Sequence, residues 1–294
     1  MLITPLSEVQ PRPRRLAVGT FDGVHLGHRA VIAGADTVLT FDPHPTTVVA
    51  PEHVPRLLTS VPMKAELLEE LGVRELVIIP FDAAFAEHSA KAFIDDVLVG
   101  ALRATQVSVG ENFRFGHRAQ GTVALLAADP RFSTHVAPLL EVDGEIVSSS
   151  HIRGLVAAGE VELATHFLGR PFELRGEVVG GDEVGRTLGF PTANQVPTQS
   201  MVVPGHGIYA SLADGRPAAT SIGVRPTFVT GRGELIETYV LDFNGDLYGH
   251  ELRVQFLRRL RGERRFDSAE ALVEQMNQDV QDARDVAEQH LARR

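Results

Sequence analysis

The chain contains no cysteine and only two lysines, Lys64 and Lys91. Without cysteine it can form no disulfide, no thiolate metal site and no cysteine nucleophile. Because lysine is so scarce, positive charge for holding an anion must come from arginine, histidine, a metal ion or backbone amides. The net charge of −10 argues against a general nucleic-acid-binding protein.

Long hydrophobic runs are also missing. No segment approaches the roughly 18 continuous apolar residues of a membrane span, and the proline-containing N-terminus lacks the pattern of a signal peptide. We therefore expect a cytoplasmic protein that binds no membrane. The length of 294 residues predicts two domains, and the hydrophobic content of 44% is enough to give each of them a core.

A glycine-rich turn is the most informative feature of the N-terminal half. The segment LAVGTFDGVHLGH, residues 16–28, ends an apolar run and delivers His25 and His28 to a helix predicted to begin near Val24. The exposed N–H groups of such a helix attract an anion. The two histidines are three residues apart, so they share one face of the first turn, where either can donate hydrogen bonds to phosphate.

A second polar segment, DPHP, follows the predicted strand Asp36–Phe41. Loops at the carboxyl ends of parallel strands are where open α/β sheets bind ligands, although a rigid proline turn is an equal alternative. Asp42 and His44 in this segment can also join His25 and His28 in a metal site, and the histidines can simply lie on the surface of a helix.

Further along, β-rich runs alternate with helical patterns. This alternation predicts a doubly wound parallel sheet. The helical stretch between His25 and Ala33 offers little more than two turns, so the first crossover is unusually short. The other predicted elements are helices Pro62–Leu71 and Ser89–Val99 and strands Leu76–Pro80 and Gln106–Val109.

The loop Gly110–Gly121 is too polar to be core. Asn112 can contact a base edge, and Phe113 or Phe115 can pack on a ring, so one interpretation is a nucleotide-binding loop. The other is a solvated loop with one aromatic side chain beneath it.

The segment SSSHIR places Ser149 at a predicted helix start and Arg153 one turn later. The serine can cap the helix or hold phosphate, and the arginine supplies a fixed positive charge. Glycine and proline in LGRPF then interrupt the helical pattern, so we expect domains at residues 1–168 and 169–294.

Short β-rich runs separated by turns dominate the second domain and predict a small antiparallel barrel. An apolar stripe near the C-terminus predicts a final helix, with Asp267 and Glu270 forming a capping-box-like start. The stripe consists of Leu272, Met276, Val280, Ala283, Ala287 and Leu291. The predicted strands are Glu173–Val179, Ile208–Leu212, Ala218–Val224, Leu235–Phe243 and Glu251–Leu257.

The segment GRTLGFPTAN, residues 185–194, is the main candidate site of this domain. Glycines beside Arg186 suit a phosphate-binding loop, and the oxygens of Thr192 and Asn194 suit Mg²⁺. A simple turn is the alternative. In the strand that begins at Leu235, alternation leaves Glu237 as the only charged residue on an apolar and aromatic face. We therefore expect a partly desolvated carboxylate with a raised pKa that acts as a general base, or one that points to solvent at a barrel edge.

The string GTFDGVHLGH resembles the H-x-G-H signature of the nucleotidyltransferases, in the form carried by bacterial bifunctional riboflavin kinase/FAD synthetases. The resemblance extends from about Leu16 to Arg284, because seven more segments follow in family order. They are TFDPHP, GENFRFG, SSSHIR, GRTLGFPTAN, GIYA, IETYVLDF and LYGHELRVQFLRRLRGERRFDS.

The resemblance implies an α/β, Rossmann-like nucleotidyltransferase domain with a parallel sheet, followed by a six-stranded antiparallel β-barrel and a terminal helix. By the same resemblance, the barrel phosphorylates riboflavin with ATP and Mg²⁺, and the first domain converts FMN and ATP to FAD and pyrophosphate. We expect a monomer or a weak homo-oligomer whose partners are ATP, riboflavin and FMN.

The resemblance also assigns roles to the site residues. His25, His28, Arg153 and the base Glu237 would be catalytic, and Thr192 and Asn194 would hold Mg²⁺. The nucleotide-binding residues would be Gly19, Phe21, Asp22, Gly23, Asp42, His44, Asn112, Ser149, Gly185, Arg186, Thr192 and Asn194.

Several departures from the family pattern are visible. The segment after His28 is about ten residues shorter, and the segment Phe132–Ser148 is also trimmed. His151 lies within the serine-arginine motif, and Gln195 follows PTAN where an apolar residue is usual. Other functions therefore stay open. The chain can be a riboflavin kinase with a weakened adenylyltransferase domain, a flavin-binding protein without turnover, or a metal hydrolase built on His25, His28, Asp42 and His44.

Overall fold

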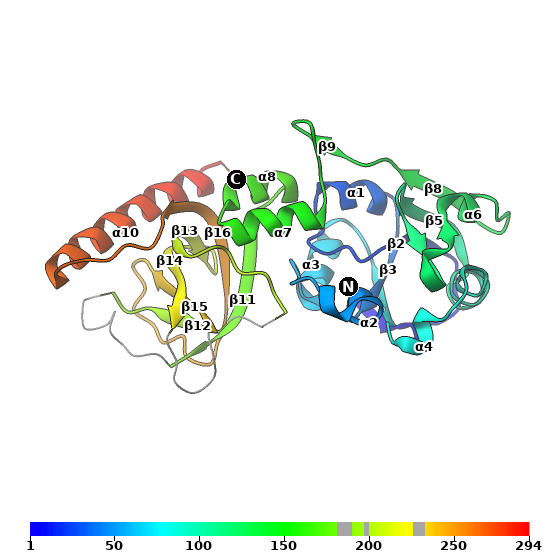
Figure 1. The fold of residues 1–294 in the computed structure, drawn as a ribbon, viewed down its shortest axis with the longest axis horizontal. Helices are drawn as coiled ribbons and strands as arrows, with labels where there is room; N and C mark the ends of the chain where they lie inside the picture. The colour runs from blue at the N-terminus through cyan, green and yellow to red at the C-terminus, as the bar shows by residue number, and fades with distance from the viewer. Residues whose placement is uncertain (181–189, 197–199, 226–232, 294) are drawn as a thin grey trace. The chain divides into compact units, whose positions relative to one another are not determined.

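The computed structural model describes residues 1–180, 190–196, 200–225 and 233–293. The chain forms two compact units, Met1–Ser149 and Ser150–Arg294 (Figure 1). Helices α7 (Ser149–Ala158) and α8 (Val161–Leu168) fall almost entirely in the second unit, and α8 packs against barrel strands β11 and β16. The boundary that we place after residue 168 stays a prediction about the domains.

A six-stranded parallel sheet forms the centre of the first unit, in the order β1-β4-β3-β2-β5-β8. This confirms the predicted parallel α/β fold. The strands are β1 (Leu2–Pro5), β2 (Arg14–Val18), β3 (Thr37–Asp42), β4 (Glu75–Pro80), β5 (Ala104–Gly110) and β8 (Ser133–Ala137). The edge strands β1 and β8 were not predicted, because both are largely exposed and lack an apolar run.

Helices and short elements connect these strands. The helical elements are η1 (Leu6–Glu8), α1 (Leu26–Ile32), α2 (Thr46–Val49), η2 (Pro51–His53), α3 (Val61–Glu70), α4 (Ala83–Ala86), α5 (Ala90–Ala92), the π-helix η3 (Phe93–Ala101), η4 (His117–Ala119) and α6 (Val123–Ala127). The predicted helix from Ser89 is thus α5 continued by η3, with Ser89 as the N-cap. Two hairpins complete the unit, β6 (Arg114–Phe115) with β7 (Gly121–Thr122), and β9 (Glu141–Val142) with β10 (Glu145–Ile146).

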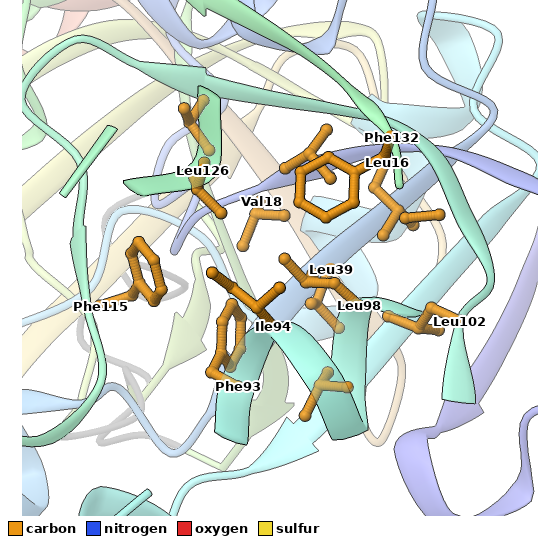
Figure 2. Packing of buried hydrophobic residues seen from close by; sticks show 14 of the residues in the cluster. Leu16, Val18, Leu39, Phe93, Ile94, Leu98, Leu102, Phe115, Leu126 and Phe132 are labelled. Atoms are coloured by element: carbon orange, nitrogen blue, oxygen red, sulfur yellow. The ribbon is translucent and has the colours of Figure 1, made fainter. Parts of the chain in front are cut away.

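Both faces of the sheet are buried, since neighbouring side chains of one strand enter different cores. Leu16 and Val18 of β2 pack with Phe93, Leu98 and other residues of η3 (Figure 2). Ala17, between them, belongs to the opposite core with α1 and α3 side chains. The short helix α1 is therefore sufficient for the crossover, and β2 and β3 pair in parallel with Leu16 opposite Thr37.

A buried ion pair closes the end of the sheet where the strands begin. Arg14 and Glu75 are 1% and 3% exposed, and the guanidinium donates from Nε to Glu75 Oε2 at 2.8 Å and from Nη2 to Oε1 at 3.1 Å. Arg12 donates to the same carboxylate. Burial alone raises the pKa of Glu75, but the hydrogen bond and charge of Arg14, with the charge of Arg12, lower it below its usual value.

The second unit is built on a closed antiparallel barrel in the order β11-β12-β15-β14-β13-β16 (Figure 1). Its strands are β11 (Phe172–Val179), β12 (Ala193–Gln195), β13 (Gly207–Ala213), β14 (Arg216–Arg225), β15 (Gly233–Val240) and β16 (Glu251–Arg261). The barrel and the final helix α10 (Ala269–Leu291) confirm the predicted fold. Among the described barrel strands only β12, the last two residues of PTAN and the following Gln195, was missed.

The final helix packs against β13, β14 and β16. Ala283 and Ala287 of the predicted stripe are buried, whereas Leu291 is 40% exposed. Asp279, on the same helix, accepts hydrogen bonds from both Nε and Nη2 of Arg261. The stripe is a packing surface, as expected.

The Arg14–Glu75 pair leads to a prediction about stability. Glu75→Gln removes a buried charge and leaves Arg14 unmatched, so we expect a loss of about 3–5 kcal/mol in the free energy of unfolding at pH 7. Because the folded-state pKa of Glu75 is lowered, the pair stabilises fully above the unfolded-state pKa of about 4.3, and this contribution is lost as pH falls through the folded-state value. Urea unfolding from pH 7 down to about pH 2 measures both effects.

The exposed carboxylate Glu70 provides the matched control. Glu70→Gln should change the free energy of unfolding by less than about 0.5 kcal/mol. Equal effects of the two substitutions, or an unchanged acid dependence in Glu75→Gln, would contradict this role of the ion pair.

Candidate active sites

The glycine-rich turn joins β2 to α1 through an unusual backbone. Phe21 and Val24 have φ values of +47° and +41°, in the left-handed region that side chains other than glycine rarely adopt. Both side chains are buried, at 2% and 1% exposure. Such conformations persist only where the surroundings hold them, so the contacts of this turn bear directly on its function.

Several segments hold the turn. Oδ1 of Asp22 accepts from the backbone N–H groups of Leu58 and Thr59 at 2.9 and 3.1 Å, and the Gly23 N–H donates to Thr59 Oγ1 at 3.0 Å. The Ser149 hydroxyl donates to the Asp22 carbonyl at 2.8 Å. The Asp22 side chain is therefore buried, with 2% exposure, and its hydrogen bonds to Leu58 and Thr59 fix the position of the turn.

The two histidines of the turn lie together, as their spacing predicts. Their rings stack with centroids 3.5 Å apart, and the edge of Phe21 meets His28 at 5.2 Å. His25 is the N-cap of α1, which begins at Leu26 rather than near Val24, and its Nδ1 accepts the His28 N–H at 3.2 Å. Because Nδ1 accepts, the proton of the neutral ring lies on Nε2, which is the atom that can donate to a ligand.

Other predicted residues of the first unit lie at the carboxyl ends of its strands. Asp42 ends β3 and is exposed, and His44 Nδ1 lies 2.7 Å from Thr46 Oγ1. Asn112 is exposed in the loop after β5. Phe115 is a core residue, 6% exposed, so it cannot pack on a ligand, and the partly exposed Phe113 stacks on it.

The serine-arginine motif lies at the start of α7. Arg153 belongs to the second compact unit and donates from Nη1 to Ser150 Oγ at 3.3 Å. His151, a departure from the family pattern, packs its ring against Phe167 of α8 at 4.9 Å. The departure is therefore accommodated by packing within this unit.

Strand β12 brings the two candidate residues of the barrel together. Asn194 pairs directly with Glu237 of β15, so the two side chains project on the same side of the barrel wall. The alternation predicted for β15 is confirmed as far as Val240, because Ile236 and Thr238 are buried at 1% and 0% exposure while Glu237 is partly exposed. The strand ends at Val240, so Leu241 and Phe243 do not extend it as predicted. Glu237 therefore lies on the outer face, opposite to the buried interior.

A cavity of about 620 Å³ is lined by Asn194, whereas Glu237 is not among its lining residues. Thr192 and Asn194 line it from one side, Thr238 and Val240 from β15, and the segment Phe243–Tyr248 closes another side. Phe190 of the same motif packs edge-on against Tyr239 at 5.5 Å and so holds the motif on β15. A cavity of this size, with polar groups at one wall, suits a nucleotide or a flavin.

Two structural features of the candidate sites were missed from the sequence. The segment Phe243–Tyr248 lines the cavity, although the sequence singled out none of its residues as ligand-binding. Lys64 lies under the glycine-rich turn, whereas its scarcity suggested that lysine would contribute nothing to an anion site. Predicted residues Gly185 and Arg186 lie outside the described residues.

The metal-hydrolase alternative is not supported. Across the described ranges, no three His, Asp or Glu side chains converge as metal ligands, including His25, His28, Asp42 and His44. The described helices also include none with the length and hydropathy of a membrane span.

Comparison with known proteins agrees with this two-site architecture. Residues 7–151 match the family model of FAD synthetase, and residues 168–287 match that of riboflavin kinase. The chain is therefore a two-domain protein that joins these two families. It is 38% identical to the bifunctional riboflavin kinase/FMN adenylyltransferase of Bacillus subtilis, over 91% of this chain and 90% of that one. The chain belongs to the bifunctional riboflavin kinase/FMN adenylyltransferase family.

Two further proteins are similar to this chain over nearly its full length. The Escherichia coli protein of the same name is 37% identical over 92% of this chain and 91% of its own length. A crystal structure described as a macrolide-efflux protein from Streptococcus pneumoniae has a TM-score of 0.88 and 28% identity, and covers 97% of this chain and 99% of that one. The architecture is thus shared over nearly the full chain.

Proposed function

We propose that the two units catalyse consecutive reactions. The barrel transfers the γ-phosphoryl group of ATP to the 5′-hydroxyl of riboflavin and forms FMN and ADP. The first unit joins FMN to the adenylyl group of a second ATP and forms FAD and pyrophosphate. The observation that carries the proposal is the pairing of Asn194, which lines a ligand-sized cavity, with Glu237 of β15, in a chain that also carries the stacked His25 and His28.

In the barrel, the proposed base is Glu237. Its carboxylate takes the proton of the riboflavin hydroxyl as that oxygen attacks the γ-phosphorus, and ADP leaves. Asn194, directly opposite, and Thr192 supply the neutral oxygen donors that Mg²⁺ accepts, and phosphate oxygens of ATP complete such a site. The bound cation would neutralise phosphate charge, while these residues orient the nucleotide beside the base.

In the first unit, the proposed reaction is a direct displacement. A phosphate oxygen of FMN attacks the α-phosphorus of ATP, and pyrophosphate leaves without a covalent enzyme intermediate. Nε2 of His25 and the ring of His28 donate hydrogen bonds to the transferring phosphates. The serine-arginine motif supports a role for Arg153 as a fixed positive charge in the same reaction. Catalysis then depends mainly on positioning and electrostatic stabilisation.

The decisive experiment incubates the purified protein with riboflavin, ATP and Mg²⁺ and separates the flavins by chromatography. We expect FMN first and FAD later. Formation of FMN alone would support the riboflavin-kinase-only alternative, and unchanged riboflavin would contradict both.

His28→Ala should separate the two activities. Loss of this donor removes stabilisation that develops in the transition state, so we expect FMN-to-FAD conversion to fall by roughly 10²-fold or more. FMN formation should stay unchanged. The exposed His53, 77% accessible, gives the control His53→Ala, which should alter neither rate. Equal loss of both activities in His28→Ala would argue against two independent sites.

Glu237→Gln should have the opposite effect. An amide cannot accept the hydroxyl proton, so we expect FMN formation to fall by about 10²- to 10⁴-fold while FAD synthesis from supplied FMN continues. The exposed Glu251 of β16 offers the control Glu251→Gln. A rate of riboflavin phosphorylation within a few-fold of wild type would exclude Glu237 as the base.

Metal dependence tests the roles of Thr192 and Asn194. Removing Mg²⁺ with EDTA should abolish FMN formation, and added Mg²⁺ should restore it. Asn194→Ala should raise the Mg²⁺ concentration needed for half-maximal rate by roughly tenfold, because one oxygen donor is lost. An unchanged Mg²⁺ requirement in this variant would remove Asn194 from the metal site.

A further inference from the structure

Lys64 is a buried cation beneath the glycine-rich turn. It belongs to α3 and is 7% exposed, whereas the side chain of the only other lysine, Lys91, is 85% exposed. Its Nζ donates to the Thr20 carbonyl at 2.6 Å and lies 3.4 Å from Thr40 Oγ1. Thr40 Oγ1 also donates to the Thr20 carbonyl, at 3.1 Å. An ammonium group is rarely buried in this way unless its surroundings compensate the charge.

Two carboxylates provide that compensation. Burial lowers the pKa of Lys64, and the charges of Asp22 and Asp42 oppose this shift. Asp22 lies within the turn, and Asp42 ends the neighbouring strand β3. Lys64 therefore connects the two segments that the sequence singled out as ligand-binding, although the reaction as described above does not use it.

We propose that Lys64 is a positioning residue for adenylyl transfer, which holds the glycine-rich turn in shape and offsets the two carboxylates beneath the triphosphate of ATP. The proposal rests on the proposed function of the first unit. The Thr20 carbonyl that Lys64 holds immediately precedes Phe21, the first residue with left-handed backbone. By holding the Thr20 carbonyl, Lys64 fixes the orientation of the peptide between Thr20 and Phe21. This orientation determines the path of the backbone from the turn to His25.

The charge argument is independent of the backbone argument. Asp22 and Asp42 carry two negative charges, and Lys64 is the cation that acts on both. Without it, a polyanionic triphosphate would approach these carboxylates with one positive charge fewer nearby, and the repulsion between the negative charges would increase. Lys64 therefore lowers the electrostatic repulsion between ATP and the carboxylates of Asp22 and Asp42 without contacting the nucleotide.

Substitution at both lysines tests the proposal, with ATP kinetics of FMN adenylylation as the readout. Lys64→Met keeps the length of the side chain but removes its charge and donor, so we expect the KM for ATP to rise roughly tenfold to a hundredfold. Lys64→Arg restores the charge and should recover part of this loss. Lys91→Met should leave the KM unchanged, and riboflavin phosphorylation by the barrel should be unaffected in every variant.

A spectroscopic measurement on the wild-type protein covers the case in which Lys64→Met unfolds the first unit. With lysine labelled at ¹³Cε, the spectrum contains two side-chain signals, and Lys91→Arg assigns them. Saturation with α,β-methylene-ATP should shift the Lys64 signal and leave that of Lys91 in place.

The outcomes separate this proposal from the function on which it rests. Wild-type protein that forms FMN but no FAD overturns the adenylyltransferase function itself. Wild-type FAD synthesis together with an ATP KM within twofold of normal in Lys64→Met overturns the role of Lys64. A Lys64 signal that does not respond to the saturating ATP analogue overturns it as well.

Discussion

The first unit depends on a turn that its own residues do not favour. Phe21 and Val24 adopt left-handed backbone, which costs on the order of 1–3 kcal/mol at each residue. The cost is offset by contacts from distant parts of the chain: the Leu58–Thr59 segment, Lys64 and Ser149 each bond to residues of the turn. Because these contacts come from separate elements, the site exists only when the whole unit is folded.

In the barrel, strand pairing positions the candidate site residues. The three residues of β12 pair with both β11 and β15, and in doing so they help to close the barrel and set Asn194 opposite Glu237. Gln195, which departs from the family pattern, is 2% exposed, and its Nε2 donates to the carbonyls of Gly176 and Leu252. The polar residue thus reinforces the barrel wall next to the site and leaves the site residues intact.

Stability and function are separated within the first unit. The buried Arg14–Glu75 pair lies where the strands β2 and β4 begin, and the glycine-rich turn and Asp42 lie where β2 and β3 end. In parallel sheets the carboxyl ends of the strands carry the ligand-binding loops, so the opposite end is free to carry a structural ion pair. Substitutions at the two ends should therefore have different consequences.

Much of the architecture could be read from the residues because it depends on local patterns. Alternation of β-rich and helical runs predicted the parallel sheet. Alternation of side chains in β15 predicted that Glu237 lies on the opposite face of the strand from Ile236 and Thr238. Elements without a strong apolar pattern escaped prediction. The exposed edges β1 and β8 and the three-residue β12 are strands because a neighbour pairs with them. The cavity segment Phe243–Tyr248 likewise depends on where the fold places it.

The sequence by itself determined the two-domain order, the family, and the residue types in each candidate site, since these are properties of short contiguous segments. Only the tertiary structure decided that His25 caps its helix and stacks on His28, that Asn194 faces Glu237, and that Lys64 lies beneath the turn. These relations join residues whose spacing carries no local signal. They arise from strand register, from packing and from the need to compensate buried charge, and all three exist only in the folded chain.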